Sequence, residues 1–169
     1  MPSDKQLLEA AQSFLDAFSS ASPSMKLVNY FSTTMPAFIE HAPSSSCRQP
    51  PSRLIGLNAL RSYFDLLSMN FKRPDVIMRG TPAVDGVARR VVIVTSTGWT
   101  WKMSGRKWTE DSTWILDFDE SFKIRGFTVK TMSDPKTCVL QAVDVEAPRG
   151  NAANNLRQVA LTTTEPALS

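Results

Sequence analysis

Residues 97–118, TGWTWKMSGRKWTEDSTWILDF, predict one β-hairpin that brings all four tryptophans and a carboxylate onto a single face. A two-residue turn at Ser104-Gly105 would set Trp101 opposite Trp108 and Trp99 opposite Glu110. The same register sets Thr95 opposite Trp114. Because residues two apart in a strand share a face, the face formed in this way contains Trp99, Trp101, Trp108, Glu110, Trp114, Leu116 and Phe118. This composition is typical of a pocket wall.

The hairpin register decides where Glu110 points, because a slip of one residue would send Glu110 and the tryptophans to opposite faces. Aromatic cross-strand pairs also commonly fill a core, so the tryptophans alone fit either a pocket wall or ordinary packing. A carboxylate among indoles is costly to ionise unless it finds a partner or reaches water. Glu110 is therefore either an acid or base with a raised pKa, or a residue at a pocket mouth paired to an arginine.

The composition indicates one globular domain. The chain has 169 residues, of which 42% are hydrophobic and 21% charged, as in ordinary soluble proteins. We expect the domain at residues 1–145 and a flexible tail at 146–169, where the periodicity is lost. The basic residues behind the net charge of +3 are scattered along the chain, so a nucleic-acid partner is not expected.

Metal ligands and membrane segments are not expected either. The two cysteines, Cys47 and Cys138, lack metal-type spacing, and His41 is the only histidine, so we expect no metal. Charged residues interrupt the apolar stretch near the start, which argues against a signal peptide. No apolar run approaches the roughly 20 residues of a membrane span. A cytoplasmic protein without a membrane partner is the expectation.

Three helices are expected before the strand-rich part of the chain. Ser3 and Gln6 form a capping-box pattern at the start of the first helix. In the third, Leu60, Phe64 and Leu67 recur at helical spacing, and a proline follows at position 74. The helices are predicted at residues 3–18, 25–31 and 57–71.

Alternation with a period of two predicts the strands. A short strand at 37–41 puts Ile39 and His41 on one face and Glu40 on the other. Residues 42–53, rich in serine and proline, are predicted to be a loop. A switch of parity at Arg125-Gly126 predicts a β-bulge that bends its strand. The longer strands are predicted at 76–78, 87–102, 107–119 and 122–131, with a further one possible at 138–143.

This α+β order of elements resembles the nuclear transport factor 2-like superfamily, and more narrowly its SnoaL-like branch. The segments that carry the resemblance are LLEAAQSFLDAF, PAFIEHAP, LIGLNALRSYFDLL and WTWKMSGRKWTEDSTWILDFDESFKI, and it spans residues 6–143. It implies a cone-shaped α+β barrel, with a strongly bent antiparallel sheet covered by three N-terminal helices. It also implies a pocket between sheet and helices, and often a homodimer formed through the outer sheet face.

The resemblance implies a cofactor-independent enzyme of secondary metabolism. Such an enzyme uses acid-base chemistry on an apolar, polyketide- or terpenoid-like small molecule. Isomerisation, cyclisation and dehydration all stay open, and other members are non-catalytic ligand-binding or dimerisation domains. In ketosteroid isomerase-like members an aspartate base lies on the short strand before the loop, in a context like V-E-D-P. The matching segment Ile39-Glu40-His41-Ala42 places His41 at that position.

We therefore expect His41 and Glu110 to exchange protons with a substrate, and Tyr30 or Tyr63 to orient its carbonyl or hydroxyl group. Each also has a plainer interpretation, since lone histidines and buried tyrosines are often structural hydrogen-bonding groups. Catalysis would require a cavity of roughly 300–1,000 Å³ with His41 or Glu110 at its wall. Its other lining residues are predicted to be Trp99, Trp101, Trp108, Trp114, Phe14, Phe18, Phe64 and Arg48.

Overall fold

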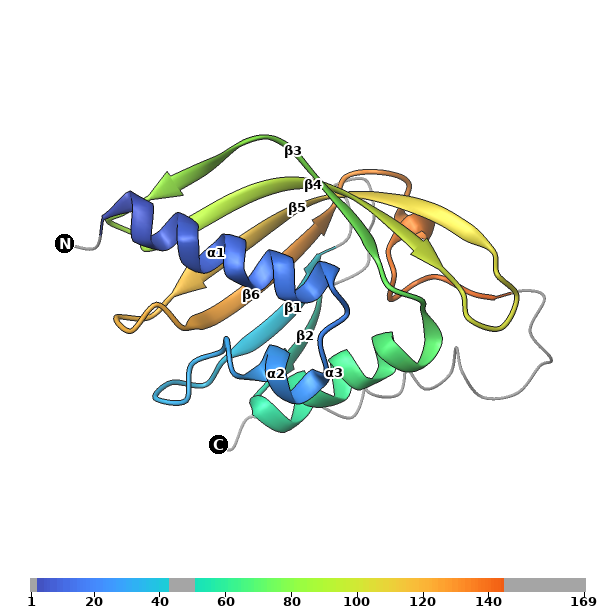
Figure 1. Cartoon of the computed structure of the whole chain (residues 1–169), viewed down its shortest axis with the longest axis horizontal. Helices are drawn as coiled ribbons and strands as arrows, with labels where there is room; N and C mark the ends of the chain where they lie inside the picture. The colour runs from blue at the N-terminus through green and yellow to red at the C-terminus, as the bar shows by residue number, and fades with distance from the viewer. Residues whose placement is uncertain (1–2, 43–50, 145–169) are drawn as a thin grey trace.

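A computed structural model of the chain describes residues 3–42 and 51–144. Three helices cover a strongly bent sheet of six strands, and Figure 1 shows α1 lying across the sheet with α2 and α3 below it. This is the predicted α+β arrangement. The predicted tail at 146–169 and Arg48 lie outside the described residues, and the domain boundary at 145 stays a prediction.

The helices follow the predicted pattern closely. Helix α1, Asp4–Ser19, begins at the capping box, in which the Ser3 side chain accepts from the backbone N–H of Gln6 and the Gln6 side chain accepts in return. Helix α2, Ser24–Val28, is shorter than the predicted 25–31. Helix α3, Leu57–Asn70, ends where Phe71 becomes extended, because the nearby proline disfavours further helix. None of the described helices is both long and apolar enough to cross a membrane.

The sheet is open and mixed, in the order β2-β1-β6-β5-β4-β3. The prediction of an antiparallel sheet was wrong for one pairing, since β1 and β6 run parallel. Strand β2 also lies partly within the segment predicted to be a loop, and it pairs antiparallel with β1. The strands are β1 (Phe38–Ala42), β2 (Ser52–Ile55), β3 (Asp75–Asp85), β4 (Arg90–Thr100), β5 (Lys107–Phe118) and β6 (Ile124–Thr131).

The central hairpin forms, but in a register two residues away from the predicted one. Trp99 pairs with Trp108, and Thr97 pairs with Glu110. The connection is longer than a two-residue turn, because the Trp101 N–H donates to the Arg106 carbonyl at 2.9 Å and closes a wider loop. A shift of two residues keeps every side chain on its face. Glu110 therefore points inward, as predicted.

The predicted bulge lies at Arg125, directly before Gly126. Asp117 pairs with Gly126 whereas the next residue, Phe118, pairs with Ile124, so Arg125 is the extra residue. The side chains of Ile124 and Phe127 are both buried as a result. The bulge restores one continuous apolar face across the change of parity.

The strand considered for residues 138–143 does not form. A short 3-10 helix, η1 (Pro135–Thr137), is followed by turns instead. These turns bring Cys138 and Val139 into the interior, where both are buried. The segment thus adds a wall beside the inner face of β5.

Candidate active site

Five polar side chains meet in the interior between the sheet, α3 and the turn after η1, and we call them the buried polar cluster. They come from β1, α3, β5, the end of β6 and the turn after η1, and all are at least 95% buried. The distant elements meet because β1 pairs with β6 and β6 with β5. The members are His41, Tyr63, Glu110, Thr131 and Cys138.

Glu110 is held by three hydrogen-bond donors. Its Oε2 accepts from the Trp99 indole Nε1–H at 3.1 Å and from the Val139 backbone N–H at 3.2 Å. Its Oε1 accepts from the Thr131 hydroxyl at 2.8 Å. No arginine pairs with Glu110 in the described part of the chain. The interpretation as a buried acid or base therefore fits this residue better than the ion-paired alternative.

Burial raises the pKa of Glu110 to about 7, and the three hydrogen bonds only partly oppose this rise. Removal from water penalises the charged form more than the donors stabilise it. A carboxyl group with this pKa exists in both protonation states near neutral pH. It can therefore take up or give up a proton there.

His41 lies between Tyr63 and Cys138. Its Nε2 is 2.8 Å from the Tyr63 hydroxyl, and its Nδ1 is 3.8 Å from the Cys138 thiol. Both ring nitrogens thus face groups that can donate. The neighbouring Glu40 points to the other face, where its carboxylate binds Arg53 at 2.6 Å. Both orientations agree with the predicted alternation along β1.

Burial keeps the groups around Glu110 uncharged. It lowers the pKa of His41 to about 3, so the imidazole is neutral at physiological pH. It raises the pKa of the Cys138 thiol to about 11, with the Glu110 charge adding to the effect. Burial also raises the pKa of Tyr63, helped by the Glu110 and Cys138 charges. Glu110 is thus the member of the cluster that titrates near neutral pH.

The cluster also contains the donor types of a metal site. One ligand atom each from His41, Glu110 and Cys138 lies within 4.8 Å of the others, and nitrogen, oxygen and sulfur ligands together suit zinc. However, both carboxylate oxygens and the histidine Nε2 already have hydrogen-bond partners. These contacts favour a hydrogen-bonded network over a metal site.

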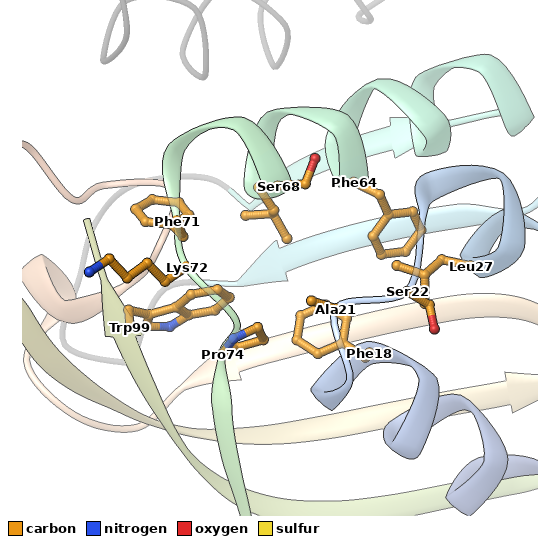
Figure 2. A pocket seen from close by; sticks show the side chains of 11 residues that line it. Phe18, Ala21, Ser22, Leu27, Phe64, Ser68, Phe71, Lys72, Pro74 and Trp99 are labelled. Atoms are coloured by element: carbon orange, nitrogen blue, oxygen red, sulfur yellow. The ribbon is translucent and has the colours of Figure 1, made fainter. Parts of the chain in front are cut away.

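A small apolar pocket lies between α1, α3 and the sheet (Figure 2). We call it the helix-side pocket. It has a volume of about 50 Å³, and three of the predicted lining residues, Phe18, Phe64 and Trp99, contribute to it. Trp99 therefore faces the pocket and also contacts Glu110. The remaining residues of the wall are Ala21, Ser22, Leu27, Leu67, Ser68, Phe71, Lys72 and Pro74.

A second, larger pocket lies at the tip of the central hairpin, and we call it the hairpin pocket. Its volume is about 190 Å³. Two predicted residues, Trp101 and Trp108, form part of its wall beside η1. The full lining is Trp101, Arg106, Lys107, Trp108, Lys136, Thr137, Ala142 and Val143. Neither of these two pockets, within residues 3–42 and 51–144, is lined by His41 or Glu110.

The other predicted residues take structural positions. Trp114 and Phe14 pack in the core, with their ring centroids 6.5 Å apart. Tyr30 follows α2, and its hydroxyl lies 3.3 Å from the Ser13 hydroxyl, away from the buried polar cluster. Only Tyr63 of the two tyrosines joins that cluster.

Cys138 and Thr131 belong to the cluster but were not predicted as site residues. Thr131 shares the parity of Phe127 and Val129 along β6, which was the available signal. No such signal exists for Cys138, because a turn, and not a strand with alternating side chains, brings this residue into the interior.

No family model and no curated protein sequence matches the chain. Solved structures do match it. AusH from Aspergillus nidulans is 18% identical with a TM-score of 0.64, covering 79% of this chain and 88% of its own. BvnE pinacolase from Penicillium brevicompactum is 17% identical with a TM-score of 0.64, covering 95% and 98%.

A third structure is the epoxide hydrolase/cyclase-like enzyme SalBIII, described for pyran ring formation in the polyether salinomycin. It is 12% identical with a TM-score of 0.63, and covers 80% of this chain and 97% of its own. At these identities the shared feature is the fold. The bent sheet, its three helices and these structural neighbours together show that the chain shares the α+β fold of these solved structures, as its sequence predicted.

Proposed function

We propose that the protein is an isomerase or cyclase that acts by acid-base chemistry on an apolar small molecule of secondary metabolism, without a metal or organic cofactor. The observation that carries the proposal is the inward-pointing carboxyl group of Glu110, whose pKa of about 7 suits proton exchange near neutral pH. The pinacolase and the cyclase-like enzyme among the structural neighbours support this reaction class.

The members of the buried polar cluster would have different roles in the reaction. Glu110 would remove a proton from the substrate and return it to another atom. His41 stays neutral, so its role would be to hold the Tyr63 hydroxyl, which lies 2.8 Å away. That hydroxyl would then donate to a carbonyl oxygen as negative charge develops on it. The tryptophan rings would supply the apolar surroundings and could stabilise a cationic centre.

Access to Glu110 from the helix-side pocket would require a movement of Trp99. The helix-side pocket, at about 50 Å³, is smaller than the roughly 300–1,000 Å³ of typical ligand sites. The Trp99 indole lines that pocket and binds Glu110 at 3.1 Å. Rotation of this ring would connect the pocket to the carboxyl group and break only one of its three hydrogen bonds.

The direct test is conversion of a metabolite. The purified protein is incubated with an extract of the source organism, and mass spectrometry is used to find a converted compound. Glu110→Gln is expected to abolish the conversion, because an amide cannot take up the proton. Glu120→Gln removes an exposed carboxylate and serves as the matched control. Conversion that survives both Glu110→Gln and His41→Ala would contradict the assigned roles.

A second candidate function is a ligand-binding domain without catalysis, because neither of the two pockets described above is lined by His41 or Glu110. Aromatic rings occupy much of the space between α1 and the sheet, with the centroids of Phe14 and Phe127 5.3 Å apart. In that case a compound would be retained by the protein unchanged. Retention without conversion by both the wild type and Glu110→Gln would support this candidate.

We also propose a homodimer formed through the outer face of the sheet. Val94 and Ile77 lie on that face and are each 47% exposed, so this face offers apolar surface to a second subunit. Sedimentation velocity is expected to show a dimer that Val94→Lys weakens, because a charge would then be desolvated at the interface. A monomer at all concentrations would contradict the proposal. The cytoplasmic location and the absence of a nucleic-acid partner stay predictions.

A further inference from the structure

The hairpin pocket combines aromatic rings with positive charge. Three basic residues, Arg106, Lys107 and Lys136, lie around the indoles of Trp101 and Trp108. All three basic side chains are exposed, and none forms an ion pair within the described part of the chain. The acidic residues nearest to Lys136 and Val143 in sequence, Asp134 and Asp144, are not part of the pocket lining. The residues that line the pocket therefore carry three positive charges and no negative charge.

The two indoles give the pocket an aromatic wall. The ring centroids of Trp101 and Trp108 are 5.6 Å apart, with 33° between the ring planes. The Trp108 ring is fixed in place, because its Nε1–H donates to the Thr137 carbonyl at 2.9 Å. Trp108 is only partly buried. A rigid, partly exposed indole offers a stacking surface to a planar ligand.

The walls of this pocket lead directly to Glu110. At the pocket, the Trp108 indole donates to the Thr137 carbonyl. Two residues further along each of these two segments, Glu110 accepts from the Val139 N–H at 3.2 Å. Since a strand rises about 3.3 Å per residue, the backbone of Glu110 lies roughly 7 Å further along β5 than that of Trp108. A ligand held on the indoles would thus lie next to the interior that contains the buried polar cluster.

We propose that the hairpin pocket binds the anionic end of a planar, unsaturated small molecule, with a carboxylate or a similar group facing Arg106, Lys107 and Lys136 and the ring system lying against Trp101 and Trp108. This inference extends the proposed function, because such a molecule would be the substrate class. Guanidinium and ammonium groups select an anionic group, and the indoles select a flat hydrocarbon.

Binding of naphthoate tests the proposal, with the uncharged naphthamide as the matched ligand. Nitrogen-proton correlation NMR follows the four indole N–H signals. Naphthoate is expected to shift the Trp101 and Trp108 signals and to bind more tightly than naphthamide. Exposed ion pairs are weak, so each cation should contribute roughly a two- to fivefold gain in affinity. Added salt should reduce the gain by screening the charges.

The triple variant Arg106→Gln, Lys107→Gln and Lys136→Gln removes all three cations of the pocket and is expected to bind naphthoate and naphthamide equally. Lys5→Gln is the matched control, since this exposed residue lies in the first turn of α1, and Figure 1 shows the start of α1 at the opposite end of the molecule from the connection between β4 and β5. Equal affinity of the wild type for both ligands would overturn the proposal. So would a preference for naphthoate that the triple variant keeps.

The Glu110→Gln variant separates this proposal from the proposed function. It should still bind naphthoate with wild-type affinity, because Glu110 does not line the hairpin pocket. A preference for naphthoate without any conversion of metabolites would support the binding site and remove only the catalytic role. Conversion that depends on Glu110, with no preference for naphthoate, would remove only the binding site.

Discussion

The Trp99 indole donates its Nε1–H to Glu110 over 3.1 Å, and the same ring forms part of the wall of the helix-side pocket. One side chain therefore separates the apolar pocket from the buried carboxyl group. It also sets part of that group's acidity, because a donor to a carboxylate stabilises the charged form. Trp99 thus connects the shape of the interior with its chemistry.

Trp99→Phe is expected to raise the pKa of Glu110 further above 7. The substitution keeps an aromatic ring but removes the indole donor, which is one of three groups that lower this pKa. The pKa can be measured by carbon NMR of the labelled glutamate carboxyl group. Trp114→Phe is the control, because Trp114 packs against Phe127 at 5.0 Å between ring centroids and is not a donor to Glu110. An unchanged or lower pKa in Trp99→Phe would contradict the role of the indole.

Glu110 is expected to make the protein less stable as pH rises from about 4.5 to about 7. The unfolded chain releases this proton near 4.5, while the folded chain holds it until about 7. The stabilising contribution is therefore fully present below 4.5, and about 3 kcal/mol is lost as pH passes through the folded value. Urea unfolding across this range measures it. Glu110→Gln should lack that loss, and an identical pH profile in both proteins would contradict the raised pKa.

The titration of His41 is expected to make the protein less stable as pH falls, which is the opposite of the effect of Glu110. Its pKa falls from 6.5 to about 3 on folding, so the unfolded chain gains a proton first as the solution is acidified. The free energy of unfolding should drop by about 4–5 kcal/mol between these values. His41→Gln, which can still bind the Tyr63 hydroxyl, should show a smaller drop. His41 is the only histidine, so its imidazole ring NMR signals can be assigned without ambiguity, and a titration of those signals near pH 6.5 in the folded protein would show that it is not buried as a neutral ring.

The inward direction of Glu110 could be predicted although the hairpin register could not. Parity along a strand decides the face, and parity survives a shift of two residues. The register depends on the loop, where the Trp101 N–H binds the Arg106 carbonyl. Ser104-Gly105 looked like a two-residue turn because the sequence pattern does not reveal this wider closure. The helix at Leu57–Asn70 was easier to predict, since the spacing of its apolar residues depends only on neighbours within the same segment.

Contacts between distant segments were beyond the sequence pattern. The parallel pairing of β1 with β6 joins residues about 90 positions apart, and no local period encodes it. Cys138 was missed for a similar reason, because a turn after η1, and not a strand, carries it to His41 at 3.8 Å. His41 and Glu110 were found separately as inward residues. Their membership of one cluster follows from the order of the strands in the sheet.

Gly126→Ala is expected to destabilise the fold without altering the hydrogen bonds of Glu110, none of which involves residue 126. A Cβ atom at position 126 would lie 2.6 Å from the Phe38 ring, so the ring or the β1 backbone must move. Overpacking of this kind costs roughly 1–3 kcal/mol, and urea unfolding measures it.

Gly98→Ala is the control for this substitution, because its Cβ would lie 3.3 Å from the Asp75 side chain, a milder contact. Equal stability of the two variants would show that β1 yields easily at Phe38. In that case β1 could move relative to β6 at little cost in stability, although the parallel pairing of these strands holds His41 in the cluster. A large loss in Gly126→Ala alone would instead show that the bend in β6 and the position of β1 depend on each other.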